Sequence, residues 1–308
     1  MDIVLGISIT GDKINRLMAL LTIVSFYENT ITKKINIKIA SDNFKAFNEI
    51  KNIVKIIYKN KETRIEYVKP SNIYKNIAPP LKQNYATYWK FDLFRDLKKN
   101  EILFYMDNDS ICISEFNITE LVKIFEDGIV KLMGVHSPRP NLERYSVLRL
   151  KSPFQYFNAG ILIGLKDNSY SINNISRTIK LLRSLDPLDL IWHDQDIFNY
   201  LFNEKVYLLD PTYNFSTGYM NKEFRVFNLL NDQFMNILRK KIKIIHFSGN
   251  FILNKKYHPY MEIYYQKLNE LKKILIESSI NEKILLQYLK QIELILNSKH
   301  FKRLDHLL

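Results

Sequence analysis

Cysteine is nearly absent from this sequence, and long apolar runs are absent altogether. The single cysteine, Cys112, allows no internal disulfide and no zinc site made of several thiolates, which fits a reducing compartment. The longest apolar stretch, residues 17–27, is too short to span a bilayer and is interrupted by threonine and serine. No charged segment with a small-residue cleavage site opens the chain, so no signal peptide is expected. We therefore predict a cytoplasmic protein, with peripheral contact with the cytoplasmic face of a membrane as the alternative.

Internal repeats and low-complexity segments are also missing, and the composition is that of an ordinary globular protein. The 308 residues are 46% hydrophobic and 25% charged, with a formal net charge of +13. Residues 1–100 carry +9 of this charge, because 18 lysines and arginines stand against 9 acidic residues there. Such a balance favours a polyanionic partner: nucleic acid, an anionic membrane surface or a phosphate-bearing substrate. Solvated lysines that bind nothing would give the same count, so charge alone leaves the choice open.

Strand-like apolar runs alternate with longer helix-like segments in the first half of the chain. The expected strands are residues 3–9, 35–40, 64–68, 101–106 and 130–135. The expected helices are residues 13–29, 44–56 and 85–99. This alternation predicts an α/β fold with a mainly parallel sheet covered on both faces. Because such sheets bind ligands at the carboxyl ends of their strands, polar residues at those ends are candidate site residues.

The second half continues with strands and ends in helices. Strands are expected within residues 154–164, 206–210 and 241–247, and helices at 171–185 and 194–202. From about residue 260 the sequence is helical and amphipathic, and no boundary is visible earlier. We therefore expect a domain at 1–260 and a helical C-terminal extension at 261–308. The extension carries a net charge of only +2, which favours packing or a partner helix over contact with an anionic membrane.

Asp107 and Asp109 directly follow residues 101–106, the most apolar of the expected strands. In an extended chain, side chains two apart point the same way, with Cα atoms roughly 6.5–7 Å apart. Both carboxylates can therefore approach one divalent cation, while Asn108 points elsewhere. His246 ends another apolar strand, and two carboxylates with one imidazole suit Mn²⁺ better than an all-oxygen Mg²⁺ site. A polar turn and a hydrogen-bonded loop histidine would explain the same residues without a metal.

Two further segments place polar groups at the ends of expected elements. Asn158 precedes an alanine and a glycine, whose small size lets a ligand approach the backbone closely. Because Asn158 begins its strand, that strand must run antiparallel to the others if it faces the same site. A β-bulge at a sheet edge is the alternative. Asp194, Gln195 and Asp196 crowd the start of a helix, where an ordinary N-cap is the alternative for Asp194.

Taken in order, these segments resemble the retaining glycosyltransferases of family 8, which include glycogenin and bacterial lipopolysaccharide galactosyltransferases. That family shows a strand ending in Asp-X-Asp, then Phe-Asn-(Ala/Ser)-Gly, then Asp-Gln-Asp, then His-Phe-X-Gly. The matching segments here are residues 107–109, 157–160, 194–196 and 246–249, and Lys90 matches a basic residue before the Asp-X-Asp. The resemblance covers about residues 1–260. It implies a GT-A-type fold, with a mixed, mostly parallel sheet flanked by helices.

The resemblance also implies a role for each matching residue. Asp107, Asp109 and His246 would bind Mn²⁺, or Mg²⁺ as the alternative, and the cation would hold the diphosphate of a UDP-sugar. The implied nucleotide contacts are Thr10, Asp12, Lys90 and Asn108. The implied sugar contacts are Asn158, Ala159, Gly160, Asp194 and Gln195. The implied diphosphate contacts are Gly249, Lys255 and Lys256. Asp194 and Gln195 are the implied catalytic residues, with either a transient nucleophile or an acceptor that attacks on the leaving-group face.

Two positions depart from the family pattern. The stacking tyrosine of the family is absent near the first strand, which leaves Thr10 and Asp12 as the candidate uracil contacts. His258 stands where the family has the lysine of its Lys-Pro-Trp, and Lys255 or Lys256 is the expected substitute.

The implied function is a metal-dependent retaining hexosyltransferase. It would move glucose or galactose from a UDP-sugar to a glycan, lipid-linked or protein acceptor, as in lipopolysaccharide or glycan biosynthesis. A catalytically impaired protein of the same fold that binds sugar nucleotides or glycans is the alternative. A basic nucleic-acid-binding protein is a rival from another class. The aromatic residues form no recognised nucleic-acid motif, so we expect no nucleic-acid partner.

Overall fold

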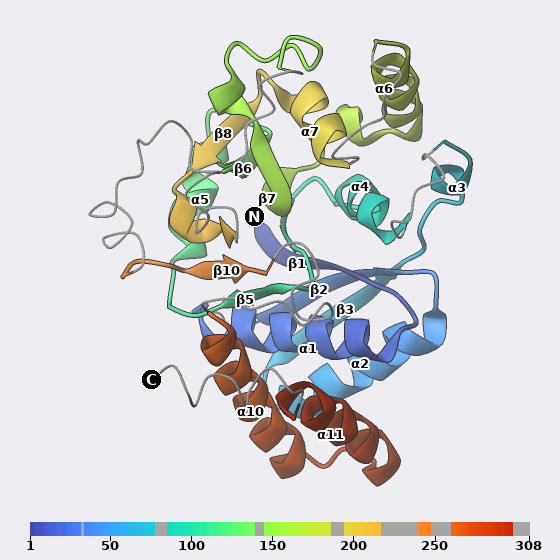
Figure 1. Ribbon diagram of the computed structural model, residues 1–308, viewed down its shortest axis with the longest axis vertical. Helices are drawn as coiled ribbons and strands as arrows, with labels where there is room; N and C mark the ends of the chain where they lie inside the picture. Colours follow the sequence, from blue (N-terminus) through green and yellow to red (C-terminus); the bar gives the residue numbers. More distant parts are fainter. Residues whose placement is uncertain are drawn as a thin grey trace.

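The computed structural model describes residues 1–31, 34–77, 85–138, 145–185, 194–216, 240–247 and 260–297. Within them the chain forms a mixed α/β fold, with a central sheet between layers of helices (Figure 1). Seven strands of this described part follow the spatial order β3-β2-β1-β4-β7-β6-β8. In that order they are β3 (Glu62–Val68), β2 (Lys34–Ser41), β1 (Asp2–Ile9), β4 (Glu101–Met106), β7 (Phe157–Leu165), β6 (Leu132–His136) and β8 (Val206–Leu209).

The sheet is mostly parallel, as expected. Strands β3, β2, β1 and β4 pair in parallel, and so do β6 and β8. Strand β7 runs antiparallel to both of its neighbours, β4 and β6. This is the direction expected for a strand whose first residues face the same edge as the carboxyl ends of the others. The end of β4 and the start of β7 therefore lie side by side.

The central strands are apolar along their whole length because both faces of the sheet are covered. Every residue of β4 is buried. Ile102 and Phe104 pack with helices α1 (Lys13–Glu28) and α2 (Phe44–Ile57) on one face, whereas Leu103 packs on the other. The helices of that other face are α3 (Ile73–Ile77), α4 (Trp89–Arg95), α6 (Ile172–Leu185) and α7 (Asp194–Phe202). Shorter helical turns are α5 (Ile118–Val122), η1 (Tyr85–Tyr88), η2 (Lys123–Phe125), η3 (Pro153–Gln155), η4 (Asn168–Tyr170) and η5 (Pro211–Tyr213).

The expected elements of the first half agree with the structure to within two residues at each end, with one exception. The helix expected at 85–99 is a 3₁₀ turn followed by the shorter helix α4. In that turn the Thr87 hydroxyl donates a hydrogen bond to Asp194, 107 residues further along the chain. Such a tertiary contact leaves no trace in the periodicity of the sequence.

A second, smaller sheet was not expected from the sequence. In the described residues its strands are β5 (Ser110–Cys112), β10 (Ile244–His246) and β9 (Phe215–Ser216), in the order β5-β10-β9. Strand β10 runs antiparallel to β5, with His246 opposite Ser110. The strand expected at 241–247 is thus shorter and lies outside the main sheet. This pairing brings His246 beside Asp109, because the backbone N–H of Phe247 donates to the Asp109 carbonyl.

The two C-terminal helices, α10 (Met261–Glu277) and α11 (Glu282–Leu296), lie outside α1 (Figure 1). Tyr264 and Leu268 are buried in the same hydrophobic core as α1 and the strands above it. The Tyr288 hydroxyl of α11 donates a hydrogen bond to Glu49 of α2. The expected packing role of this segment has a physical basis here, while the boundary at residue 260 stays a prediction.

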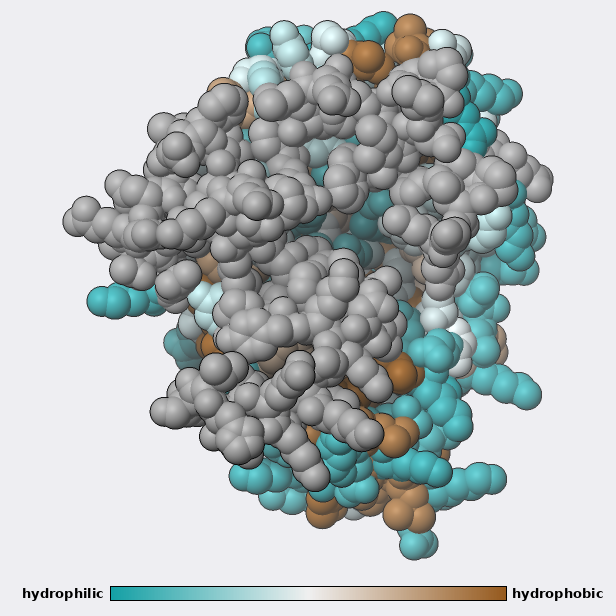
Figure 2. Space-filling model, viewed as in Figure 1, coloured by the Kyte–Doolittle hydropathy of each residue, from teal (hydrophilic) through white to brown (hydrophobic). Residues whose placement is uncertain are grey.

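The surface over these two helices is mixed in character. Figure 2 shows separate brown, apolar residues among teal, hydrophilic ones in this region. The exposed large apolar residues of α10 and α11 are Ile276, Leu286 and Leu294. Among the described helices, none combines the length and the apolar character needed to cross a lipid bilayer. The cytoplasmic location and the peripheral membrane contact both stay predictions.

Candidate active site

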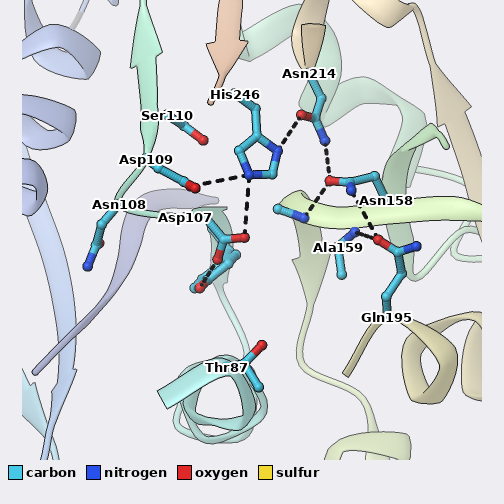
Figure 3. A network of polar contacts seen from close by, with 12 residues as sticks. Thr87, Asp107, Asn108, Asp109, Ser110, Asn158, Ala159, Gln195, Asn214 and His246 are labelled. Atoms are coloured by element: carbon cyan, nitrogen blue, oxygen red, sulfur yellow. Dashed lines mark hydrogen bonds and ion pairs between the residues drawn. The ribbon is translucent and has the colours of Figure 1, made fainter. Parts of the chain in front are cut away.

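The candidate metal ligands come together at the junction of the two sheets. Asp107 follows β4, Asp109 precedes β5, and His246 ends β10. One ligand atom from each of the three lies within 4.8 Å of the other two. His246 Nε2 is 3.2 Å from Asp109 Oδ1 and 3.8 Å from Asp107 Oδ2 (Figure 3). Two carboxylates and one imidazole are a donor set that fits Mn²⁺, so the residues present are chemically suited to a divalent cation.

Asn108 points away from the two carboxylates between which it stands, as expected for alternating side chains (Figure 3). Its Nδ2 donates to the Ser8 carbonyl at the end of β1 and, at 3.2 Å, to Asn15 Oδ1. The amide thereby joins the Asp-Asn-Asp segment to the first strand and its following helix.

The buried His246 and the partly exposed Asp107 and Asp109 shift one another's pKa values in different directions. Burial by itself would lower the pKa of His246, but Asp109 and Asp107 outweigh it and raise that pKa. Burial raises the pKa of Asp107 in spite of Lys90 and His246 nearby. For Asp109 the effect of burial is outweighed by His246, so its pKa is lowered. Asp109 is therefore the stronger anionic partner of the imidazole.

Lys90 links Asp107 to the start of α7. The side chain is almost completely buried, and its Nζ lies 2.6 Å from Asp194 Oδ2 and 3.4 Å from Asp107 Oδ1. It also donates to the Ala159 carbonyl at 3.0 Å and stands 4.8 Å from the centre of the Tyr105 ring. The Tyr105 hydroxyl donates to Asp107 Oδ1 at 2.6 Å, which fixes that carboxylate from a second side.

Asp194 is turned into this network and does not simply cap its helix. Its Oδ1 accepts a hydrogen bond of 2.6 Å from the Thr87 hydroxyl, while Oδ2 pairs with Lys90. Asp196 faces elsewhere, is fully buried, and accepts a hydrogen bond of 2.7 Å from Tyr156. The three polar residues at this helix start therefore have different surroundings.

Asn158 and Gln195 form the other half of the site. Asn158 Oδ1 accepts hydrogen bonds of 2.8 Å from Asn214 Nδ2 and from the backbone N–H of Gly160. Asn158 Nδ2 and the backbone N–H of Ala159 both donate to Gln195 Oε1, at 3.0 and 3.1 Å. Strand β7 and helix α7 are thus joined at the position where the family pattern places the sugar contacts.

Gly160 is small for a reason that differs from the expected one. A Cβ atom at this position would lie 2.1 Å from His246 Cε1 and 2.6 Å from His246 Nδ1. From the sequence, the glycine was expected to leave space for a ligand. In the structure it leaves space for the imidazole ring. The nearest group is a rigid ring, so a larger residue here would have to displace the histidine.

A β-bulge at a sheet edge was the alternative for this segment, and the structure shows a shift of register inside the sheet. Gly134 of β6 pairs with Leu162, and the next residue, Val135, pairs with Asn158. Residues 159–161 of β7 therefore have no pairing partner in β6, because consecutive residues of β6 pair on either side of them. Because β7 lies between β4 and β6, the irregularity is central and not at an edge. The shift of register and the candidate site coincide at this point.

The family model described as glycosyl transferase family 8 matches residues 7–251. The chain belongs to glycosyl transferase family 8. A curated relative, General stress protein A of Bacillus subtilis (strain 168), is 26% identical over 209 residues, which cover 65% of this chain and 70% of the relative.

Solved glycosyltransferases share the fold of this family 8 chain. An active-site mutant of LgtC matches with a TM-score of 0.66 at 14% identity, covering 92% of this chain and 98% of LgtC. LgtC in complex with donor and acceptor sugar analogues matches with a TM-score of 0.64 at 15% identity, covering 93% of this chain and 100% of LgtC. The bifunctional glycosyltransferase WbbM matches with a TM-score of 0.61 at 18% identity over 85% of this chain. This chain spans 51% of the length of WbbM.

The remaining residues singled out by the family 8 pattern differ in how the structure places them. Thr10 follows β1, whose parallel pairing with β4 puts it at the same sheet edge as Asp107. The Asp12 side chain caps α1 by accepting a hydrogen bond from the Asn15 backbone. Their contacts with a nucleotide stay predictions. The predicted diphosphate contacts Gly249, Lys255 and Lys256 lie outside the described residues.

Four residues that contact the candidate site residues were not found from the sequence. They are Asn15, Thr87, Tyr105 and Asn214. Tyr105 stands two residues before Asp107 on the same side of an extended strand, so the period of two could have indicated it. Asn214 lies five residues beyond the end of β8, at the sheet edge that the site occupies. No spacing rule connects it to His246.

Proposed function

We propose that this chain is a metal-dependent retaining hexosyltransferase that uses a UDP-sugar as donor. Glucose or galactose is the sugar, and a glycan, lipid-linked or protein molecule is the acceptor. The observation that carries the proposal is the convergence of Asp107, Asp109 and His246 beside the Asn158–Gln195 contact. The fold of LgtC with donor and acceptor sugar analogues supports a nucleotide sugar and an acceptor as partners.

The metal-side residues suit the charge that develops in such a reaction. Cleavage of the bond between sugar and phosphate leaves negative charge on the departing diphosphate, and Mn²⁺, or Mg²⁺ as the alternative, stabilises that charge when bound. Asp107, Asp109 and His246 would hold the cation. Lys90 adds a fixed positive charge between Asp107 and Asp194. Because Lys90 is buried, that charge acts in a medium of low dielectric constant, where it is worth more than in water.

The residues on the sugar side are oriented before any substrate arrives. Thr87 and Lys90 hold the two oxygens of Asp194, and Asn158 with the Ala159 backbone holds the oxygen of Gln195. Side chains fixed in this way lose little freedom on binding, which favours precise placement of the donor sugar. Asp194 and Gln195 are the proposed catalytic residues. Retention follows either from a transient nucleophile or from an acceptor that attacks on the leaving-group face.

The test is a donor panel with a matched pair of variants. Purified protein is incubated with UDP-glucose, UDP-galactose and other UDP-sugars in Mn²⁺, Mg²⁺ or EDTA, and released UDP is measured. We expect release with at least one donor, its loss in EDTA, and a fall of about 100-fold or more in Asp109→Asn. Asp127→Asn, which changes an exposed aspartate in the same way, should keep the activity.

Two outcomes count against the proposal. If no donor releases UDP but nucleotides raise the melting temperature, the chain is a protein that binds sugar nucleotides without catalysing transfer. Equal release from Asp109→Asn and the unchanged protein would remove the metal site from the reaction. Where a donor is consumed, the anomeric configuration of the product decides between retention and inversion.

A further inference from the structure

Asn214 stands between the two halves of the site. It is almost completely buried and lies between η5 and β9. Its Oδ1 is 3.0 Å from His246 Nδ1, and its Nδ2 is 2.8 Å from Asn158 Oδ1 (Figure 3). One side chain thus touches both a candidate metal ligand and a candidate sugar contact.

The direction of these hydrogen bonds is decided by the backbone. A side-chain amide can be turned over without a change of shape, so its neighbours must set which end donates. A backbone N–H can only donate. Gly160 N–H therefore requires an oxygen from Asn158, and Ala159 N–H requires an oxygen from Gln195. The Asn158 nitrogen is then the end that donates to Gln195 Oε1.

The same logic extends to the imidazole. Because the Asn158 oxygen is fixed, Asn214 must present its nitrogen to it and its oxygen to His246. The His246 Nδ1 therefore carries a proton and donates it to Asn214. Nε2 faces Asp107 and Asp109. It can donate to Asp109 when it carries a proton, and its lone pair would be the ligand atom for a cation bound there.

The opposite arrangement of the amides is excluded by the same contacts. Turning Asn214 over alone would set its oxygen against the Asn158 oxygen. Turning Asn158 over as well would set the Asn158 nitrogen against the Gly160 N–H, so that two donors would face each other.

We propose that Asn214 is a positioning residue that fixes the tautomer of His246 and couples the metal side of the site to the donor-sugar side. The coupling rests on the proposed function, because it concerns the cation and the sugar of that reaction. The tautomer does not rest on it, since it follows from contacts of the chain itself. When a group that orients a metal-ligating histidine through its second nitrogen is removed, metal affinity commonly falls 10- to 100-fold.

Two variants of Asn214 separate its two contacts. In Asn214→Asp the side chain still accepts from His246 Nδ1, but it sets an oxygen against the Asn158 oxygen. In Asn214→Leu both contacts are lost. Asn29→Leu is the matched control. Asn29 is also buried, and its amide donates to the carbonyl groups of Ser25 and Cys112 instead of contacting His246 or Asn158.

The readouts are the tautomer and the affinity for Mn²⁺. The tautomer is read from ¹⁵N spectra of the metal-free protein at a pH where the ring is neutral, with the His246 signal identified by its loss in His246→Gln. Mn²⁺ binding is followed by electron paramagnetic resonance. We expect the Nδ1–H form in the unchanged protein, in Asn214→Asp and in Asn29→Leu. For Asn214→Leu we expect a mixture of tautomers and an Mn²⁺ affinity about 10- to 100-fold weaker.

Release of UDP completes the test of the coupling. Asn214→Asp should hold Mn²⁺ within about threefold of the unchanged protein while UDP release falls about 10- to 100-fold. An unaltered tautomer and Mn²⁺ affinity in Asn214→Leu would overturn the positioning role. An equal loss of Mn²⁺ affinity in Asn29→Leu would overturn it too, since general destabilisation would then suffice. If the unchanged protein shows the expected tautomer and binds Mn²⁺ but releases no UDP, the proposed function fails and the tautomer assignment stands.

Discussion

At the scale of single residues, the imidazole of His246 occupies the space that a side chain at position 160 would fill. In Gly160→Ala the new Cβ would meet the ring at 2.1 to 2.9 Å, so the histidine must move. We expect Mn²⁺ affinity, measured by paramagnetic resonance, to fall about 10-fold or more, since the ligand leaves its place beside the carboxylates. UDP release should fall with it.

Gly164 of the same strand provides the control for this prediction. A Cβ there would lie 2.9 Å from Phe94 and 3.0 Å from Leu132, both core side chains far from the imidazole contact. Gly164→Ala should therefore lower the melting temperature through overpacking while Mn²⁺ affinity is retained. If Gly160→Ala also changed only the melting temperature, the glycine would be a packing residue without influence on the metal side.

At the scale of elements, an ionic cluster around the buried side chains of Lys38 and Glu101 ties three strands and the end of α4 together. Lys38 Nζ of β2 lies 3.0 Å from Glu101 Oε2 of β4 and 2.8 Å from Asp96 Oδ2. Arg64 of β3 reaches the other Glu101 oxygen at 2.9 Å. Glu101→Gln would remove the negative charge of the buried carboxylate that pairs with the buried Lys38 ammonium group. We expect the free energy of unfolding, from urea titration at pH 7, to drop by about 3 kcal/mol.

The same cluster predicts a pH dependence of stability. Burial acts to raise the pKa of Glu101, but hydrogen bonds from the Lys98 backbone and Lys38 outweigh it and lower that pKa. Its contribution to stability is therefore complete above the unfolded value of 4.5 and is lost as pH falls through the lower, folded value. For Lys38, burial opposes the partners Asp96 and Glu101, which raise its pKa, so its contribution persists up to 10.5 and is lost above that value.

The difference in unfolding free energy between the unchanged protein and Glu101→Gln is the quantity to follow. It should be constant from about pH 6 to 8 and shrink below about pH 4.5. If the difference stayed constant down to pH 3, ionisation of the Glu101 carboxylate would not stabilise the fold.

Elements with a strong local signal could be predicted from the sequence, and elements fixed by distant contacts could not. Strand β4 is apolar without interruption because both faces are buried, and that run alone located Asp107 at its carboxyl end. The strand that contains β10 was expected from its apolar run, but its pairing with Cys112 and its neighbours, more than 130 positions earlier, leaves no periodic pattern. Hence the sequence indicated His246 as a ligand but not Asn214, whose role depends on that small sheet.

At the scale of the whole molecule, the C-terminal helices and the first helix share one hydrophobic core. Leu268 of α10 is completely buried in the core that also holds residues of α1, β1 and β4. The Tyr288 hydroxyl donates to Glu49, and Glu49 pairs with Arg16 of α1 in turn. Helices held in this way should unfold together with the rest of the fold and not as a separate extension.

Leu268→Ala tests this cooperativity. Removing a fully buried leucine side chain should cost about 2–5 kcal/mol and lower the midpoint of one single unfolding transition, seen alike by circular dichroism and calorimetry. Leu286→Ala, which shortens a leucine of α11 that is 57% exposed, should change the stability by no more than about 0.5 kcal/mol. Two unfolding transitions would instead show that α10 and α11 form an independent unit, provided that Leu268→Ala lowers the midpoint of the less stable one only. In that case the boundary expected at residue 260 would be a true domain boundary, because the core at α1 would survive without them.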